Sequence, residues 1–74
     1  MIILYTKTIC PKCMLVKSEI ERLGVEVETK NIDHDAEAKQ LVIDKGFMAA
    51  PILQVGDEWY SDVSEIINQL EQHA

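Results

Sequence analysis

Apolar and polar residues follow one another along this chain in short blocks that predict alternating strands and helices. Residues 2–5 are a continuous apolar run, which is typical of a strand buried on both faces. Along residues 25–30, Val25, Val27 and Thr29 alternate with charged side chains, which predicts a half-exposed strand. Its charges would protect a sheet edge from pairing with another chain. Residues 52–55 and 58–60 flank Gly56-Asp57, a dipeptide that favours the turn of a hairpin. The pattern therefore predicts four strands.

Apolar residues at helical spacing mark three further segments. The first begins at Pro11, which suits the first helical position because the N–H that proline lacks has no partner there, and it ends at Gly24. The second follows a turn at Asn31–Asp35. Before the third, Asp62 and Glu65 resemble a capping box. The apolar positions of the three helices are Val16, Ile20 and Leu23, then Ala38, Leu41 and Val42, and finally Val63, Ile66, Ile67 and Leu70.

The predicted order of elements is βαβαββα, which indicates one α/β domain over residues 1–74. The first strand, the first helix and the second strand form a βαβ unit, so these two strands should be parallel. With the later hairpin, we expect a four-stranded mixed sheet flanked by three helices. A chain of 74 residues is near the smallest size at which a single hydrophobic core keeps a domain folded. Apolar residues make up 47% of the chain, which fits a compact soluble domain.

Charge narrows the classes of partner. Seven basic and thirteen acidic residues give a formal net charge of −6, the opposite of what a protein for nucleic acid or an anionic membrane needs. The acidic balance fits docking to basic protein surfaces, and it fits plain solubility as well. No apolar run approaches the ~18 residues that cross a bilayer. The N-terminus lacks the basic segment of a secretory signal, and we expect a monomer in the cytoplasm.

Both cysteines lie in the segment Cys10-Pro11-Lys12-Cys13, where the first strand leads into the first helix. They are too close together to join distant parts of the chain, so they are not the staples of a secreted scaffold. At a helix N-terminus, free N–H groups and the helix dipole stabilise an anion, and Lys7 and Lys12 add positive charge. Such surroundings move the pKa of a thiol from ~8.5 to between roughly 3.5 and 7.5. Cys13 lies one helical turn after Cys10, within reach of a disulfide.

A reactive pair of this kind predicts thiol–disulfide exchange. Cys10, the more exposed, would attack a target disulfide, and the more buried Cys13 would then attack the Cys10 sulfur and release the reduced target. Pro11 would stiffen the short ring that a disulfide between Cys10 and Cys13 closes. Two other interpretations stay open: two inert cysteines, or half of a zinc site that only His34 and His73 could complete. Neither histidine stands in a recognisable ligand pattern, so we favour redox chemistry and predict no metal site.

Four motifs are spread along the chain: Leu4-Tyr5-Thr6-Lys7, Cys10-Pro11-Lys12-Cys13, Asn31-Ile32-Asp33 and Ala50-Pro51. Together they resemble the glutaredoxins and the glutaredoxin-like redoxins of the NrdH type, which serve ribonucleotide reductase. The resemblance covers nearly the whole chain and implies a thioredoxin fold. It also implies a cis peptide bond before Pro51, beside the active site, where the backbone of Ala50 pairs with a bound peptide or glutathione. Lys7 matches a basic residue near the thiolate or a glutathione carboxylate, although a solvated loop lysine explains it equally well.

Departures from the glutaredoxin pattern concern the electron donor. Lys12 stands where glutaredoxins commonly carry an aromatic residue, and residues 59–62 lack the glycine pair that holds glutathione in the family. Asp62 could still offer a carboxylate and helix N-terminal amides to glutathione, or act only as an N-cap. Glutathione and a thioredoxin reductase both remain candidate reductants, with the second favoured, and no tightly bound cofactor is expected.

The leading hypothesis is a thiol–disulfide oxidoreductase that carries electrons to a disulfide-containing protein such as ribonucleotide reductase. The alternative from another class is a non-enzymatic binding module that docks a partner or carries a metal ion or iron–sulfur cluster, although Pro11 stiffens the loop and argues against the cluster. Met14 and Met48 would line an apolar rim or fill the core, whereas Trp59 and Tyr60 would cover the sheet. The predicted substrate-binding residues are Lys7, Pro11, Lys12, Ala50, Pro51 and Asp62.

Overall fold

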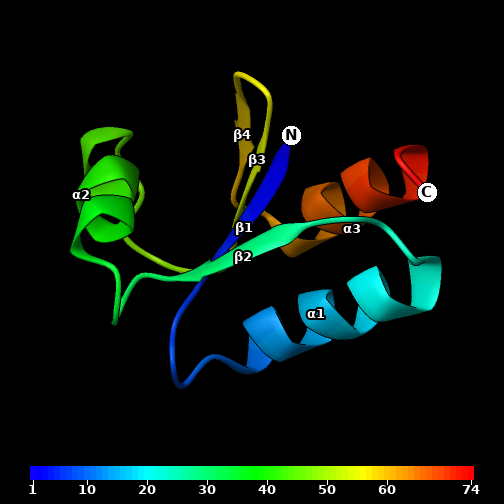
Figure 1. Ribbon diagram of the computed structural model, residues 1–74, viewed down its shortest axis with the longest axis horizontal. Coiled ribbons are helices and arrows are strands. Elements are labelled where there is room, and N and C mark those ends of the chain that lie inside the picture. Colours follow the sequence, from blue (N-terminus) through cyan, green and yellow to red (C-terminus); the bar gives the residue numbers. More distant parts are fainter.

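The computed structural model describes residues 1–74 and contains seven elements in the predicted βαβαββα order (Figure 1). The strands are β1 (Ile2–Thr6), β2 (Glu28–Asn31), β3 (Ile52–Val55) and β4 (Glu58–Tyr60). The helices are α1 (Pro11–Leu23), α2 (Ala36–Asp44) and α3 (Val63–Gln72). The α/β class and the order of elements are therefore confirmed.

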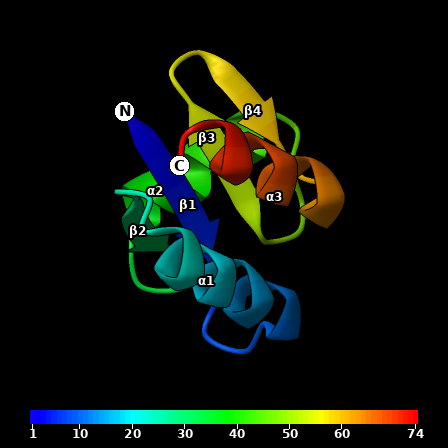
Figure 2. The same ribbon diagram turned by 90° about the vertical axis from the view of Figure 1, so that its right-hand side faces the viewer.

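β1 lies inside the sheet, as its apolar sequence predicts. The strand order is β2-β1-β3-β4, with β1 and β2 parallel and the other two neighbouring pairs antiparallel. The sheet is mixed, and the charged β2 forms one of its edges, where charged side chains discourage pairing with another chain. Helices α1 and α3 cover one face of the sheet and α2 covers the other, as Figure 1 and Figure 2 show from two directions.

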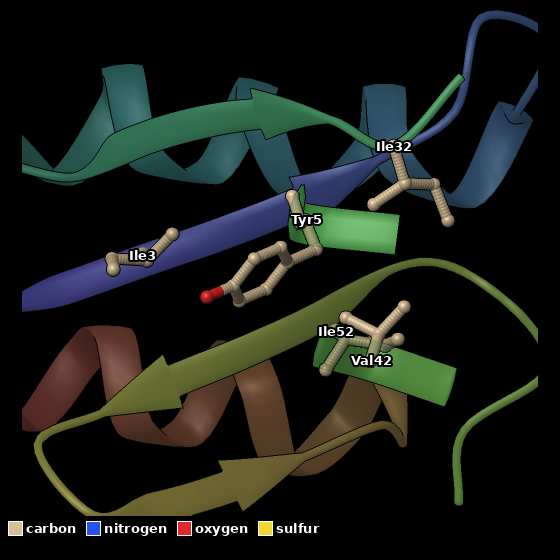
Figure 3. Close-up of a cluster of buried hydrophobic side chains, with 6 residues drawn as sticks. Ile3, Tyr5, Ile32, Val42 and Ile52 are labelled. Carbon is tan, nitrogen blue, oxygen red and sulfur yellow. The ribbon is translucent and has the colours of Figure 1, made fainter. Parts of the chain in front are cut away.

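Successive residues of β1 face opposite helix layers and so divide the core into two clusters. Ile3 and Tyr5 lie on the α2 side, where they pack with residues such as Val42 (Figure 3). Leu4 lies on the side of α1 and α3. The α2-side cluster consists of Ile3, Tyr5, Ile32, Ala38, Val42 and Ile52, and the other of Leu4, Val16, Leu53, Ile66 and Leu70.

The helix ends follow the predicted caps. Gly24 follows α1 with a φ of 70°, and its N–H donates to the Ile20 carbonyl at 2.9 Å. Asp35 and Asp62 precede α2 and α3, and the side chain of each accepts a backbone N–H from the first turn of its helix. None of the three helices has the length and continuous apolar character that crossing a bilayer requires.

The second strand is shorter than the alternation over residues 25–30 predicts. It begins at Glu28 and ends at Asn31. The register pairs Ile3 with Glu28, and β1 begins at Ile2, so β1 offers residues 25–27 little strand to pair with. Val25 and Val27 instead pack against the core cluster of α1 and α3. These two valines are therefore partly buried, as the alternation indicates, but they lie outside the hydrogen-bonded strand.

Leu41 is another departure, because its side chain is 39% exposed although it shares helical spacing with Ala38 and Val42. Those two residues, four positions apart, are the buried ones of α2. The helix contacts the sheet through Ala38 and Val42, and Leu41 lies beside this contact, where its side chain stays partly open to solvent.

Candidate active site

Cys10 stands directly before α1 and caps it. Its backbone is extended (φ −154°, ψ 94°), and its Sγ accepts a hydrogen bond from the backbone N–H of Cys13 at 3.1 Å. Pro11 follows as the first residue of the helix, as predicted. A sulfur that already accepts an N–H from the first turn lies where an anion is most stabilised by the helix.

Cys10 and Cys13 form a disulfide, with their Cα atoms 5.2 Å apart. The predicted one-turn spacing is therefore confirmed as close enough for the bond. The two sulfurs are unequal in access: Cys13 is 2% exposed and lies among the buried residues of α1, whereas Cys10 is half-buried. An incoming molecule can reach Cys10 alone.

The bond between Ala50 and Pro51 is a cis peptide bond, which confirms what the family resemblance implied. Pro51 is buried and Ala50 is half-buried. Ala50 lines a groove of 360 Å³ that also contains Cys10, and we call it the cysteine groove; its lining residues are Lys7, Ile9, Cys10, Pro11, Lys12, Met48, Ala49 and Ala50. Four of the predicted substrate-binding residues therefore meet beside Cys10, the more accessible of the two cysteines.

Asp62 and Pro51 belong to a neighbouring groove of 550 Å³, in which they lie with Lys12, Ala50 and Ser61. The carboxylate of Asp62 accepts the backbone N–H of Glu65 at 3.2 Å, so its capping role is confirmed. Its role toward glutathione stays a prediction. The cysteine groove and this one share Lys12 and Ala50, so the predicted site residues line one continuous surface.

Hydrogen bonds fasten the loop before Cys10 to the segment after β2, and sequence reasoning missed them. Asp33 Oδ2 accepts the backbone N–H of Thr8 at 2.9 Å, and Asn31 Nδ2 donates to Thr8 Oγ1 at 3.3 Å. The hydrogen bond from Thr8 holds the pKa of Asp33 below its ordinary value, and the charges of Lys7 and His34 act in the same direction. His34, weighed above as a metal ligand, has its Nε2 3.4 Å from Thr8 Oγ1. The signal in the sequence was the Asn-x-Asp turn, which matched the family motif but did not reveal its partner loop.

An aromatic stack supports the loop that leads to the cis proline. Trp59 of β4 stacks on Tyr5 at 5.5 Å and on Phe47 at 6.0 Å between ring centroids, and Lys45 Nζ lies 5.7 Å from its ring centroid. Trp59 thus packs against the α2-side core, as predicted. Burial raises the pKa of Tyr5, whose hydroxyl donates to Gln54 Oε1 at 2.7 Å. Phe47 was not singled out from the sequence, where a single aromatic residue in a loop carries no pattern.

Exposed apolar side chains surround the reactive cysteine. Ile9 is 91% exposed and Met48 is 97% exposed, and both line the cysteine groove. Met14, on the first turns of α1, is 71% exposed. Of the two expectations for the methionines, an apolar rim or core filling, the structure supports the rim. Side chains this apolar are available for contact with a partner.

The sequence profile of the family described as Glutaredoxin matches residues 2–60. The chain belongs to the glutaredoxin family. Within this family, the glutaredoxin-like protein NrdH of Escherichia coli (strain K12) is 31% identical over 70 residues, which are 93% of this chain and 86% of that protein. The protein of the same name from Lactococcus lactis subsp. lactis (strain IL1403) is 33% identical over 61 residues, 82% of this chain and 85% of that protein.

The three-dimensional likeness is equally extensive. The solved structure of the glutaredoxin-like protein NrdH-redoxin from Escherichia coli has a TM-score of 0.83 at 31% identity and covers 93% of this chain and 92% of that chain. The thioredoxin fold is therefore established for this glutaredoxin. The chain is a glutaredoxin-like redox protein whose active-site disulfide joins Cys10 and Cys13.

Proposed function

We propose that this glutaredoxin reduces disulfides in other molecules by a dithiol mechanism, with Cys10 as the nucleophile and Cys13 as the resolving thiol. The observation that carries the proposal is the unequal access to two bonded sulfurs, one half-buried at a helix N-terminus and the other 2% exposed behind it. A target can approach only the first sulfur, and only the second is placed to release it.

The first step uses the reduced protein. The Cys10 thiolate attacks one sulfur of the target disulfide, a bond forms between these two sulfurs, and the other target sulfur leaves as a thiolate that takes up a proton. The N–H of Cys13, which donates to Cys10 Sγ, and the remaining free amides of the first turn stabilise the thiolate before attack.

The second step closes the internal disulfide. Cys13 loses its proton and attacks Cys10 Sγ, the Cys10–Cys13 bond forms, and the second target sulfur leaves as a thiolate. The protein has then given up two electrons, and the target has gained them. In the closed disulfide, the Cα atoms of the two cysteines lie 5.2 Å apart, one helical turn from each other.

Target binding falls to the surface around Cys10. We assign the backbone of Ala50, beside the cis Pro51, to pairing with the extended chain of the target, because it lines the cysteine groove without a side chain that obstructs it. Lys7 and Lys12 lie on the same groove and would attract acidic groups of the target.

For the electron donor we propose a thioredoxin reductase, and for the target a protein such as ribonucleotide reductase, in the cytoplasm. The glycine pair that holds glutathione in glutaredoxins is missing from residues 59–62. The E. coli NrdH-redoxin, which this chain resembles, is described as a glutaredoxin-like protein with a thioredoxin-like activity profile. The link to ribonucleotide reductase rests on resemblance to the NrdH type.

The test follows NADPH oxidation with a small disulfide substrate in two parallel mixtures. One contains glutathione and glutathione reductase, and the other contains thioredoxin reductase. We expect turnover in the second mixture and none with Cys10→Ser. Turnover through glutathione alone would overturn the assignment of the donor and give Asp62 a binding role. Silence in both mixtures, together with no single-turnover reduction of the substrate by the prereduced protein, would overturn the oxidoreductase proposal.

A further inference from the structure

A third groove lies at the end of the sheet opposite to Cys10. It has a volume of 700 Å³, and we call it the distal groove. β1 begins at Ile2, which lines this groove, and ends at Thr6, four residues before Cys10. Its antiparallel neighbour β3 begins at Ile52 beside the cis proline and ends at Val55, which lines the groove and pairs with Ile2. In Figure 1 the N label marks the groove end of β1, and the strand runs from there toward the loop before α1. A molecule in the distal groove therefore leaves Cys10 free.

Apolar side chains from three segments line the distal groove. Ile2, Val27 and Val55 are half-buried, and all three pack against the core cluster on the side of α1 and α3. Met1, which also lines the groove, is 90% exposed. The groove thus combines an apolar base fixed by the core with an unbranched side chain that adapts to whatever packs on it. An apolar side chain that enters here is removed from water.

Two carboxylates give the distal groove its charge. Glu26 and Glu28 both line it and are exposed, and neither has a basic partner, because the one ion pair of the protein joins Arg22 to Glu19. No lysine or arginine lines this groove, and its single basic residue is the exposed His73. The carboxylates therefore stay available to an incoming cation.

The other end of the sheet carries the opposite charge. The cysteine groove is lined by Lys7 and Lys12 and by no acidic residue. A segment rich in lysine or arginine is repelled there and attracted to the distal groove, so the two ends of the sheet select partners of opposite charge.

We propose that the distal groove is a docking site for a segment of a partner protein in which an apolar side chain is flanked by lysine or arginine. The apolar side chain packs on Val27 and Val55, and the basic groups pair with Glu26 and Glu28. A free metal ion or a polyamine would satisfy the carboxylates but leave the apolar side chains uncovered, so the groove favours a protein segment. The inference goes beyond the proposed thiol chemistry, which does not use this surface, and the two can fail separately.

The experiment titrates the ¹⁵N-labelled oxidised protein with short synthetic peptides whose ends are blocked. The first peptide carries leucine flanked by lysines, the second has glutamate in place of lysine, and the third has serine in place of leucine. Amide chemical shifts locate the binding surface, and the anisotropy of a fluorescent copy of each peptide gives its Kd. With the first peptide we expect the largest shift changes at residues 2, 26–28 and 55, and little change at residues 10–13. The other two peptides should bind more weakly.

Variants test the two kinds of contact. Glu26→Gln combined with Glu28→Gln should weaken binding of the first peptide roughly 5-fold, because two exposed ion pairs are lost. Val27→Thr should weaken it about 3-fold, because it replaces an apolar contact of about one methyl group by a hydroxyl. The matched control combines Glu21→Gln with Glu37→Gln, exposed positions on α1 and α2 that line no groove, and it should leave the Kd unchanged. High salt should weaken binding to the unchanged protein.

A charge exchange keeps the test independent of folding defects. Glu26→Lys combined with Glu28→Lys should lose the lysine peptide and bind the glutamate peptide instead. Alkylation of Cys10 with iodoacetamide in Cys13→Ser should leave the Kd of the lysine peptide unchanged, because that thiol lies at the other end of the sheet.

Three results would overturn the inference. They are an absence of saturable binding, shift changes that centre on the cysteine groove or spread evenly over the surface, and an equal loss of affinity in the two double glutamine variants. None of them bears on disulfide reduction by Cys10 and Cys13, which the NADPH assay tests by itself.

Discussion

Thr6 is the polar side chain most at odds with its surroundings. It ends β1, is 1% exposed, and its Oγ1 has no hydrogen-bonding partner in the protein. By the alternation of the strand it shares a face with Leu4, the α1 and α3 side of the sheet. A buried hydroxyl left unpaired costs about 1–3 kcal/mol relative to a satisfied one. We therefore predict that Thr6→Val stabilises the protein.

The expected gain follows from the chemistry of the change. Valine puts a methyl group where the hydroxyl was, at almost the same volume, and it suits a strand at least as well as threonine. Removal of the orphaned polar group should raise the free energy of unfolding by about 1 kcal/mol. With an m-value of about 1 kcal/mol/M, typical of so small a domain, the urea midpoint of the oxidised protein should rise by about 1 M. Circular dichroism during urea titration measures it.

Thr6→Ser is the matched control, because it keeps the hydroxyl and removes the methyl group. It should lower the free energy of unfolding by about 1 kcal/mol through loss of apolar burial. The reasoning is refuted when Thr6→Val loses 1 kcal/mol or more, since that loss would mean that the hydroxyl is hydrogen-bonded. Repeating the titration on the reduced protein adds a second comparison: a loss confined to that state would identify a partner that reduction of the disulfide frees.

Three further predictions concern the cysteines, the active-site loop and the core. Cys13→Ser should accumulate the mixed disulfide between Cys10 and a target, which non-reducing mass spectrometry detects, and rapid release of the target would show that the second sulfur is not the resolving one. Because the pKa of Asp33 is lowered in the folded state, its carboxylate stabilises the fold above the ordinary aspartate pKa of about 4, and this contribution is lost as the pH falls through the folded-state value. Asp33→Asn should therefore lower the urea midpoint at pH 7 more than at pH 3, in contrast to Glu21→Gln on the exposed face of α1, and an equal drop at both pH values would contradict the assigned cause. Leu53→Ala, at a fully buried position, should cost about 2–5 kcal/mol, and a loss below about 1 kcal/mol would show that the core relaxes into the space.

Local patterns predicted most of the fold because most of its elements are defined by their own residues. The caps at Gly24 and Asp62, the apolar β1 and the hairpin turn at Gly56 needed no knowledge of distant contacts. The start of β2 did, because it depends on where β1 begins in the register. Leu41 was misread for a similar reason: which side of an apolar stripe is covered depends on how the helix lies on the sheet.

The features of the candidate site likewise divide into those that local residues define and those that depend on distant contacts. The two cysteines could be predicted as a pair because one turn of helix fixes their spacing. The cis bond before Pro51 came from the family resemblance alone, since most X-Pro bonds are trans and nothing local distinguishes this one. The link from Thr8 to Asp33 spans 25 positions, and the grooves join segments still farther apart. No periodicity in the sequence encodes such contacts.

The capping role of Cys10 has a consequence for how the protein should be mutated. Its sulfur both reacts and satisfies an amide at the start of α1, so a replacement changes two properties at once. Alanine would remove the nucleophile and also leave that amide unpaired, which typically costs about 0.5–2 kcal/mol and frays the first turn beneath the groove. Serine is among the preferred residues at this position and keeps the helix start intact. Only the serine variant isolates the chemistry of the thiol from the shape of the surface that presents it.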